Sequence, residues 1–105
     1  MGFIYLIGES ENDNKFKIGV TRSKDILKRK NKLQTGNSNE LYIKKYYESE
    51  FPFKLETMLH KHFMNNKILN EWFILSEDDI KNFDKICEKY ENIFKSLKNN
   101  PFFDK

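Results

Sequence analysis

One stretch of the chain, residues 16–36 (FKIGVTRSKDILKRKNKLQTG), limits the folds that the sequence can adopt. It joins a short apolar run at 16–20, which contains Gly19, through a polar turn to a basic segment with helical periodicity. The pattern predicts a strand, a turn and a helix that is capped by Ser23 and ends near Gln34, before Gly36. Residues 22–32 carry six cations and one acid, so we expect this segment to face an anionic partner.

The composition limits the chain to one small domain. With 105 residues, of which 38% are hydrophobic, the chain can build a single modest core. We assign residues 1–98 to this domain and residues 99–105 to a C-terminal tail. The net charge of +3 is mild, so a polyanion must be recognised by where the cations lie rather than by their number.

Cysteine content and hydropathy exclude several classes of protein. The single cysteine, Cys87, excludes an internal disulfide and a Cys-rich zinc site. No apolar run reaches the roughly 18 residues that a membrane helix needs, and the first ten residues lack the pattern of a signal peptide. We therefore expect a soluble intracellular protein of the cytoplasm or nucleus, with no membrane partner.

Hydrophobic periodicity predicts the remaining elements. Residues 3–7 and 41–47 have the composition of strands, and the polar link 9–15 indicates a hairpin between the first strand and the strand at 16–20. A second helix begins at Pro52 and ends near Phe63. Residues 71–75 form a short buried edge strand or an extended segment, and Ser76 with Asp79 opens a last helix that ends near residue 97.

Helical periodicity places few polar side chains beside the core. On the basic helix, an apolar face that includes Leu27 has Arg29 on its flank. On the second helix, Glu56 lies at the edge of the apolar stripe, and His60 follows one turn later. Glu56 is the one carboxylate in the first two thirds of the sequence that periodicity places at the edge of a core.

Two further surfaces follow from the charge pattern. One face of the strand at 41–47 carries Tyr42, Lys44 and Tyr46, a combination that can stack bases and hold phosphates but is also common on exposed strands. Residues 77–91 hold six acids against three lysines. We therefore expect the outer surface of the last helix to face away from a polyanion.

Taken in register along the chain, these segments resemble the GIY-YIG nuclease family, and within it the phage and viral branch. In that branch KIG replaces YIG, LQTG closes the arginine helix, and a Glu…LH…EWF pattern follows. The matching residues, which span positions 2 to about 80, are Phe3-Ile4-Tyr5, Lys17-Ile18-Gly19, Arg29, Leu33-Gln34-Thr35-Gly36, Glu56, Leu59-His60 and Glu71-Trp72-Phe73. The resemblance implies a small α/β fold of the α+β type, with a three-stranded antiparallel sheet flanked by helices.

The resemblance also implies an endonuclease that hydrolyses phosphodiester bonds in DNA with a single Mg²⁺ or Mn²⁺. Glu56 would be the metal ligand, because one carboxylate suits a hard cation that keeps most of its waters. Tyr5 would position or deprotonate the attacking water, with cationic charge from Lys17 and Arg29 favouring the phenolate. Arg29 can also make paired hydrogen bonds to the scissile phosphate. The expected DNA contacts are Arg22, Lys24, Lys28, Lys32, Thr35 and Lys44.

The sequence departs from the family pattern at two places. Lys17 stands where the second tyrosine of the family name lies, so Lys17 either orients Tyr5 or contacts phosphate. Leu33 stands where many members carry a histidine one turn after the arginine, and His60 is the candidate to replace that histidine as an outer or acid group. Glu71 is interpreted as a cap or brace of the fold.

Two other functions fit the sequence. A noncatalytic nucleic-acid-binding module would use the helix at 22–32 and the basic-aromatic strand face. A protein-interaction adaptor would use the Cys87 helix or the Phe102-Phe103 tail, and would show no salt-dependent affinity for DNA. A lone domain of this size carries no separate DNA-reading domain, so specificity would be low or supplied by a homodimer or an accessory protein.

Overall fold

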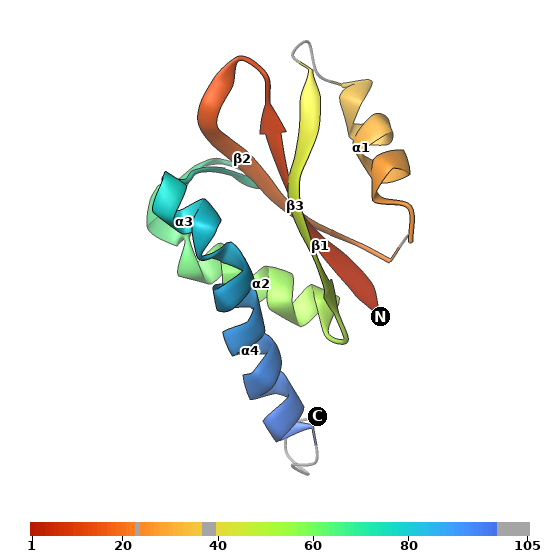
Figure 1. The fold of residues 1–105 in the computed structure, drawn as a ribbon, viewed down its shortest axis with the longest axis vertical. Helices are drawn as coiled ribbons and strands as arrows, with labels where there is room; N and C mark the ends of the chain where they lie inside the picture. Colours follow the sequence, from red (N-terminus) through yellow and green to blue (C-terminus); the bar gives the residue numbers. More distant parts are fainter. Residues whose placement is uncertain (23, 37–39, 99–105) are drawn as a thin grey trace.

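A computed structural model describes residues 1–22, 24–36 and 40–98 of the chain (Figure 1). Over these residues the chain forms one antiparallel sheet of five strands, in the order β3-β1-β2-β5-β4, and four α-helices. The elements in chain order are β1 (Gly2–Glu9), β2 (Asn12–Thr21), α1 (Ile26–Gln34), β3 (Leu41–Ser49), α2 (Pro52–His62), the 3-10 turn η1 (Met64–Asn66), β4 (Lys67–Leu69), β5 (Trp72–Ile74), α3 (Glu77–Lys81) and α4 (Phe83–Leu97).

The predicted fold class is confirmed, but the sheet has five strands where three were expected. The strands beyond those three, β4 and β5, form a short hairpin, and β5 pairs with β2 from Lys15 to Lys17. β5 lies within residues 71–75, predicted as an edge strand or an extended segment, but β4 is the strand at the edge. Asn70 in the hairpin turn has a φ of 56°, a left-handed conformation that asparagine tolerates. All three residues of β4 are exposed, and they show no alternation of apolar and polar side chains. The sequence pattern therefore did not predict this strand.

The sheet separates two apolar clusters. The larger cluster packs Ile4, Leu6 and Ile18 of the sheet against α2, α3 and α4, while the smaller one packs Tyr5 and Ile7 against α1. Figure 1 accordingly shows α1 on one side of β3 and the other three helices on the opposite side. Because β1 is covered on both faces, it is buried along nearly its whole length.

The basic helix begins later than the sequence predicted. Asp25, not Ser23, is its N-cap, and the Asp25 side chain accepts a hydrogen bond of 3.0 Å from the backbone N–H of Lys28. Ser23 lies outside the described residues. Leu27 was assigned to the apolar face of this helix, but it is 62% exposed. α1 therefore buries a narrower face than helical periodicity indicated.

The last helix is divided at Asn82. The predicted capping box at Ser76 and Asp79 is present, but the helix that it opens, α3, ends at Lys81 and α4 starts at Phe83. Cys87 is fully buried in α4, and this burial raises the pKa of its thiol to about 12. The interaction surface suggested around Cys87 is therefore core. Within the described residues, no helix is long and apolar enough to cross a membrane.

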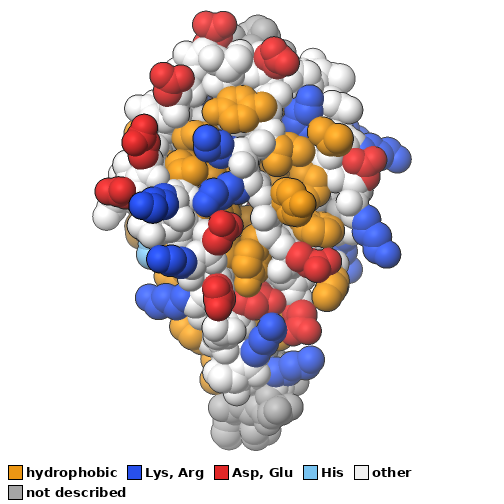
Figure 2. All heavy atoms as spheres, viewed as in Figure 1, with side chains coloured by type: hydrophobic (Ala, Val, Ile, Leu, Met, Phe, Trp, Pro, Cys, Tyr) orange, Lys and Arg blue, Asp and Glu red, His pale blue; other side chains and the backbone are white. Residues whose placement is uncertain are grey.

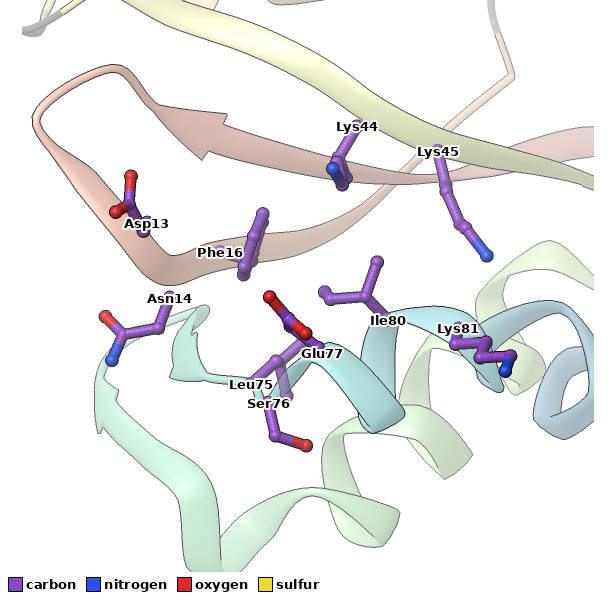
Figure 3. Close-up of a pocket in the computed structure, with 10 residues that line it drawn as sticks. All are labelled: Asp13, Asn14, Phe16, Lys44, Lys45, Leu75, Ser76, Glu77, Ile80 and Lys81. Atoms are coloured by element: carbon purple, nitrogen blue, oxygen red, sulfur yellow. The ribbon is translucent and has the colours of Figure 1, made fainter.

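An irregularity in β3 separates side chains that strict alternation placed on one face. The register between β1 and β3 shifts at Leu6 and Ile7, opposite residues 43–45. Lys44 and Lys45 consequently both point toward the α3 side of the sheet, as Figure 3 shows. Tyr46 instead lies on the α1 side, where its ring contacts Phe3. The predicted face of Tyr42, Lys44 and Tyr46 is therefore divided between two surfaces.

One acid assigned to the outer surface of the last helix is buried. Glu91 is 3% exposed, and its carboxylate accepts hydrogen bonds from the Ser49 hydroxyl and, at 2.8 Å, from the Glu50 backbone N–H. These bonds fix the end of β3 to α4 just before α2 begins. In the same region Lys45 of β3 and Asp84 of α4 form an ion pair of 3.2 Å.

Replacing Glu91 by alanine should destabilise the fold. The substitution leaves the buried Ser49 hydroxyl and the partly buried Glu50 N–H without their acceptor, which costs about 1–3 kcal/mol of the free energy of unfolding. Urea denaturation of Glu91→Ala measures this loss. Glu88→Ala, an exposed residue of the same helix, is the matched control and should change stability by less than about 0.5 kcal/mol. Equal effects of both substitutions would contradict the role of Glu91.

Candidate functional site

Tyr5 lies at the centre of the sheet, in register with Gly19 of β2 and Tyr46 of β3. Its side chain is 1% exposed and packs across Gly19. A Cβ added at Gly19 would overlap the Tyr5 ring and hydroxyl. Only glycine leaves this space, which explains the glycine of the KIG motif. The Tyr5 hydroxyl oxygen accepts a long hydrogen bond of 3.5 Å from Nε of Arg29.

Arg29 reaches Tyr5 from the first turn of α1. The residue is partly buried and lies one turn after Ile26, which anchors the helix in the smaller apolar cluster. The hydrogen bond to Tyr5 is the main cause that raises the pKa of Arg29 above its ordinary value. A guanidinium held in this way keeps donors that do not point at Tyr5 available for another oxygen ligand.

Lys17 and Glu71 form an ion pair beside this site. Their side chains are 2.7 Å apart, with Lys17 on β2 and Glu71 in the turn between β4 and β5. The backbone also joins these segments, since the Ile18 N–H donates to the Glu71 carbonyl at 3.1 Å. The Lys17 ammonium lies 5.9 Å from the centre of the Trp72 ring. The ion-pair partner of Lys17 is thus Glu71. The sequence predicted that Lys17 either orients Tyr5 or contacts phosphate.

Glu56 and His60 extend from α2 toward the edge of β2. The pairing of β5 with β2 ends at Lys17, and the next carbonyl along β2, that of Ile18, accepts a hydrogen bond of 2.9 Å from Nε2 of His60. Because a carbonyl only accepts, Nε2 carries a proton and Nδ1 is the remaining ring nitrogen. Glu56 is half-buried, as its place at the edge of the apolar stripe predicted.

The five residues predicted as catalytic are brought together. Burial is the main cause that raises the pKa of Glu56, and the charges of His60, Lys17 and Arg29 lower it. The charge of Glu56 in turn raises the pKa of Arg29. Arg29 thus interacts with both Tyr5 and Glu56, and Glu56 interacts with Lys17 and His60, so the five residues are connected through Arg29 and Glu56.

Glu71 is the member of this cluster that the sequence did not assign to the site. Its charge raises the pKa values of both Glu56 and Arg29, so it lies near both of them. The motif Glu71-Trp72-Phe73 was the available signal, but a turn position gives no direction for a side chain. Among the described residues, no group of three or more His, Cys, Asp or Glu side chains is arranged to hold a metal ion.

The residues predicted to contact DNA are divided between two surfaces. Those at or near α1 are exposed, and Arg22 also places its guanidinium 4.9 Å from the centre of the Phe53 ring. They are Arg22, Lys24, Lys28, Lys32 and Thr35. Lys44 is exposed on the α3 side of the sheet, where it borders a cavity of about 570 Å³ with Phe16 and Ile80 (Figure 3). None of the five clustered residues lines that cavity.

A comparison with protein-family models gives one match, described as the T5orf172 domain, over residues 2–89. The match covers every residue of the cluster, together with α1 and the whole sheet. No curated protein and no solved structure matches the chain.

The raised pKa of Glu56 predicts a pH-dependent effect of Glu56→Gln. In the folded protein the carboxyl holds its proton to a higher pH than in the unfolded chain, so stability is lost as pH rises from the ordinary glutamate value through the raised value. Glu56→Gln removes this loss. Its stability relative to wild type should therefore increase between about pH 3 and pH 7, on either side of ordinary glutamate titration.

Urea denaturation at both pH values, in the presence of a chelator, measures this difference. Glu88→Gln, at an exposed position, is the control and should show no such change. A stability difference for Glu56→Gln that is the same at both pH values would contradict the desolvation of Glu56.

Proposed function

Because the chain belongs to the T5orf172 domain family, a nuclease-related family associated with nuclease-like and DNA-binding functions, we propose that it is a metal-dependent endonuclease. The proposed reaction is the hydrolysis of phosphodiester bonds in DNA, of the GIY-YIG type. One observation carries the proposal: Arg29 is hydrogen-bonded to the buried Tyr5 within electrostatic reach of Glu56. In this proposal the cation, the phenol and the carboxylate act on the same phosphodiester group.

The donor set suits a single hard cation. Mg²⁺ is commonly held by one or two carboxylates and keeps several waters, and here the half-buried Glu56 has Glu71 nearby. Glu56 would hold the ion, and Mn²⁺ has the same preference for oxygen ligands. When bound, such a cation neutralises and polarises the phosphodiester group.

Arg29 and Tyr5 have complementary tasks in this proposal. The guanidinium of Arg29 can hold phosphate oxygens through paired hydrogen bonds and stabilise the charge that develops in the transition state. It also stabilises negative charge on the Tyr5 oxygen, which would accept a proton from the attacking water. Gly19 keeps the Tyr5 ring in place, so both groups approach the phosphate from fixed elements.

Lys17 and His60 support these two residues. Glu71 holds the Lys17 ammonium at 2.7 Å, so Lys17 would contribute positive potential to a bound phosphate from a fixed position. His60 is held by the Ile18 carbonyl through Nε2, so Nδ1 is the nitrogen that could exchange a proton with a leaving group or a water. His60 also lowers the pKa of Glu56, which favours the ionised carboxylate that a metal requires.

Substituting the central residues should abolish cleavage without abolishing DNA binding. We expect wild type to nick supercoiled plasmid with Mg²⁺ or Mn²⁺ and not with EDTA. Tyr5→Phe should reduce the rate by about 100-fold to 10,000-fold, the usual effect of losing a general base, and Glu56→Gln should be at least as damaging. Glu88→Gln is the control with an unchanged rate. Metal-independent nicking, or full activity of Glu56→Gln, would contradict the proposal.

A noncatalytic nucleic-acid-binding module is the second candidate. The observation that favours it is the contrast between the exposed cations of α1 and the almost complete burial of Tyr5. Salt-sensitive binding with no cleavage of plasmid or branched DNA would support this function. The adaptor function receives no support from Cys87, which is core, and Phe102 and Phe103 lie outside the described residues.

Both candidate functions predict that the cations of α1 determine the salt dependence of DNA binding. Each lysine that contacts a phosphate contributes about 0.9 to the slope of log K against log salt concentration. The triple variant Lys24→Ala, Lys28→Ala and Lys32→Ala should therefore have a slope smaller by up to about 2.7. Fluorescence anisotropy over a salt series measures it.

A matched triple variant on α4 serves as the control. It replaces Lys85, Lys89 and Lys95, which are also exposed, and should leave the slope unchanged. An equal loss of slope in both triple variants would assign DNA binding to overall charge rather than to α1.

A further inference from the structure

An open cavity lies between the beginning of α1 and the strands β1 and β3. Its volume is about 660 Å³, within the range of about 300–1,000 Å³ of small-molecule sites. Its walls are formed by five apolar or aromatic residues and two charged ones: Phe3, Ile26, Leu27, Ile43 and Tyr46, with Lys24 and Asp25. Figure 2 shows hydrophobic side chains gathered on the surface between β3 and α1.

The apolar side chains at the rim of this cavity are unusually exposed. Leu27 is 62% exposed although its position in α1 predicted burial, and Tyr46 is 60% exposed. The rings of Phe3 and Tyr46 meet at 67° with their centres 6.1 Å apart. In such an edge-to-face contact the rings do not stack on each other, so a flat ring surface is left for a third aromatic group.

The charge on the helix side of the cavity suits a phosphate. Lys24 lines the cavity, and Lys28 is exposed one turn further along α1. Asp25, which lies between them, also lines the cavity, and its carboxylate accepts the capping hydrogen bond from the Lys28 backbone N–H. On the strand side, Glu48 is in register with Phe3 and does not line the cavity. An aromatic wall beside lysines is the combination that binds a nucleotide as base and phosphate.

The cavity adjoins the proposed catalytic cluster. Tyr46 is in register with Tyr5 across the β1–β3 pair, and Phe3 and Ile43 pack in the same apolar cluster as Tyr5. On α1, Ile26 and Leu27 form a wall of the cavity, while Arg29, less than one turn later, is hydrogen-bonded to Tyr5. A strand held at Arg29 would therefore pass close to the cavity.

We propose that this cavity binds one unstacked base of a nucleic-acid strand, with the base against Tyr46 and an adjoining phosphate at Lys24. The inference rests on the proposed function and adds a substrate class to it: DNA that contains an unpaired nucleotide, as in bulged, branched or single-stranded substrates. A paired base would first have to leave its stack, and that cost is smallest where the base has no partner.

Binding in EDTA, where no metal-dependent cleavage occurs, tests the proposal. The probes are a DNA duplex with one bulged 2-aminopurine and a fully paired duplex that contains the same fluorophore. Wild type should bind the bulged duplex about 5-fold to 100-fold more tightly, the range for one base–aromatic stack, and should quench its fluorescence. Tyr46→Ala should lose the preference and the quenching, whereas Tyr46→Phe should keep both.

Two further variants control for folding and position. Tyr42→Ala removes another exposed tyrosine of β3, whose ring lies against Gly8 rather than in the cavity, and should keep the preference. Leu27→Asp adds an acid at the rim, where the side chain is already exposed, and should lose the preference even if Tyr46→Ala does not fold.

Equal affinity of wild type for both duplexes, with no quenching, would overturn the proposal. The proposal would also be overturned if the protein dimerised with increasing concentration and Leu27→Asp abolished the dimer without changing binding of the bulged probe. In that case a second copy of the chain would occupy the cavity. Failure of the proposed function is distinguishable, because it would remove plasmid cleavage in Mg²⁺ and leave the preference for the bulged probe intact. Cleavage without that preference would refute the cavity alone.

Discussion

The packing of the Tyr5 ring across Gly19 is the contact on which the site depends. It joins β1 to β2 on the face that α1 covers, and it leaves the hydroxyl where Arg29 can donate to it. A larger residue at position 19 would displace the ring, because the space above glycine is filled. The backbone pairing of β1 with β2 holds Tyr5 opposite Gly19. The docking of α1 through Ile26 holds Arg29 beside Tyr5. The packing of Tyr5 across Gly19 is therefore required both by the sheet and by the site.

The edge of β2 is the second feature that the site requires. β5 pairs with β2 only as far as Lys17. Beyond that residue the same edge of β2 lies against α2, while the other edge still pairs with β1. His60 occupies this edge by donating to the Ile18 carbonyl, and Glu56 lies one turn earlier on the same helix. A longer β5 would pair with this edge of β2 in place of His60. The short hairpin also carries Glu71 in its turn, next to Lys17.

Several expectations were wrong for identifiable physical reasons. Leu27 was placed in the core because helical periodicity assigns the apolar residues of α1 to one buried face. In the structure α1 buries a narrower face, and Leu27 is exposed. Lys44 and Tyr46 were placed on one face because alternation assumes a regular strand, and the shift in the β1–β3 register interrupts it. Glu91 was placed at the surface because it is charged, but hydrogen bonds from β3 make its burial favourable. Each error concerns contacts between elements distant in sequence.

The sequence by itself determined the antiparallel α+β class and a relationship to nucleases, because periodicity and short motifs are local properties. Tyr5, Lys17, Arg29, Glu56 and His60 are the candidates that its resemblance to GIY-YIG nucleases implies. The tertiary structure decided that Arg29 contacts Tyr5 and lies within electrostatic reach of Glu56, that Glu71 pairs with Lys17, and that an aromatic cavity opens beside α1. Strand register and helix docking decide such positions, and both depend on interactions between segments that local sequence patterns do not encode.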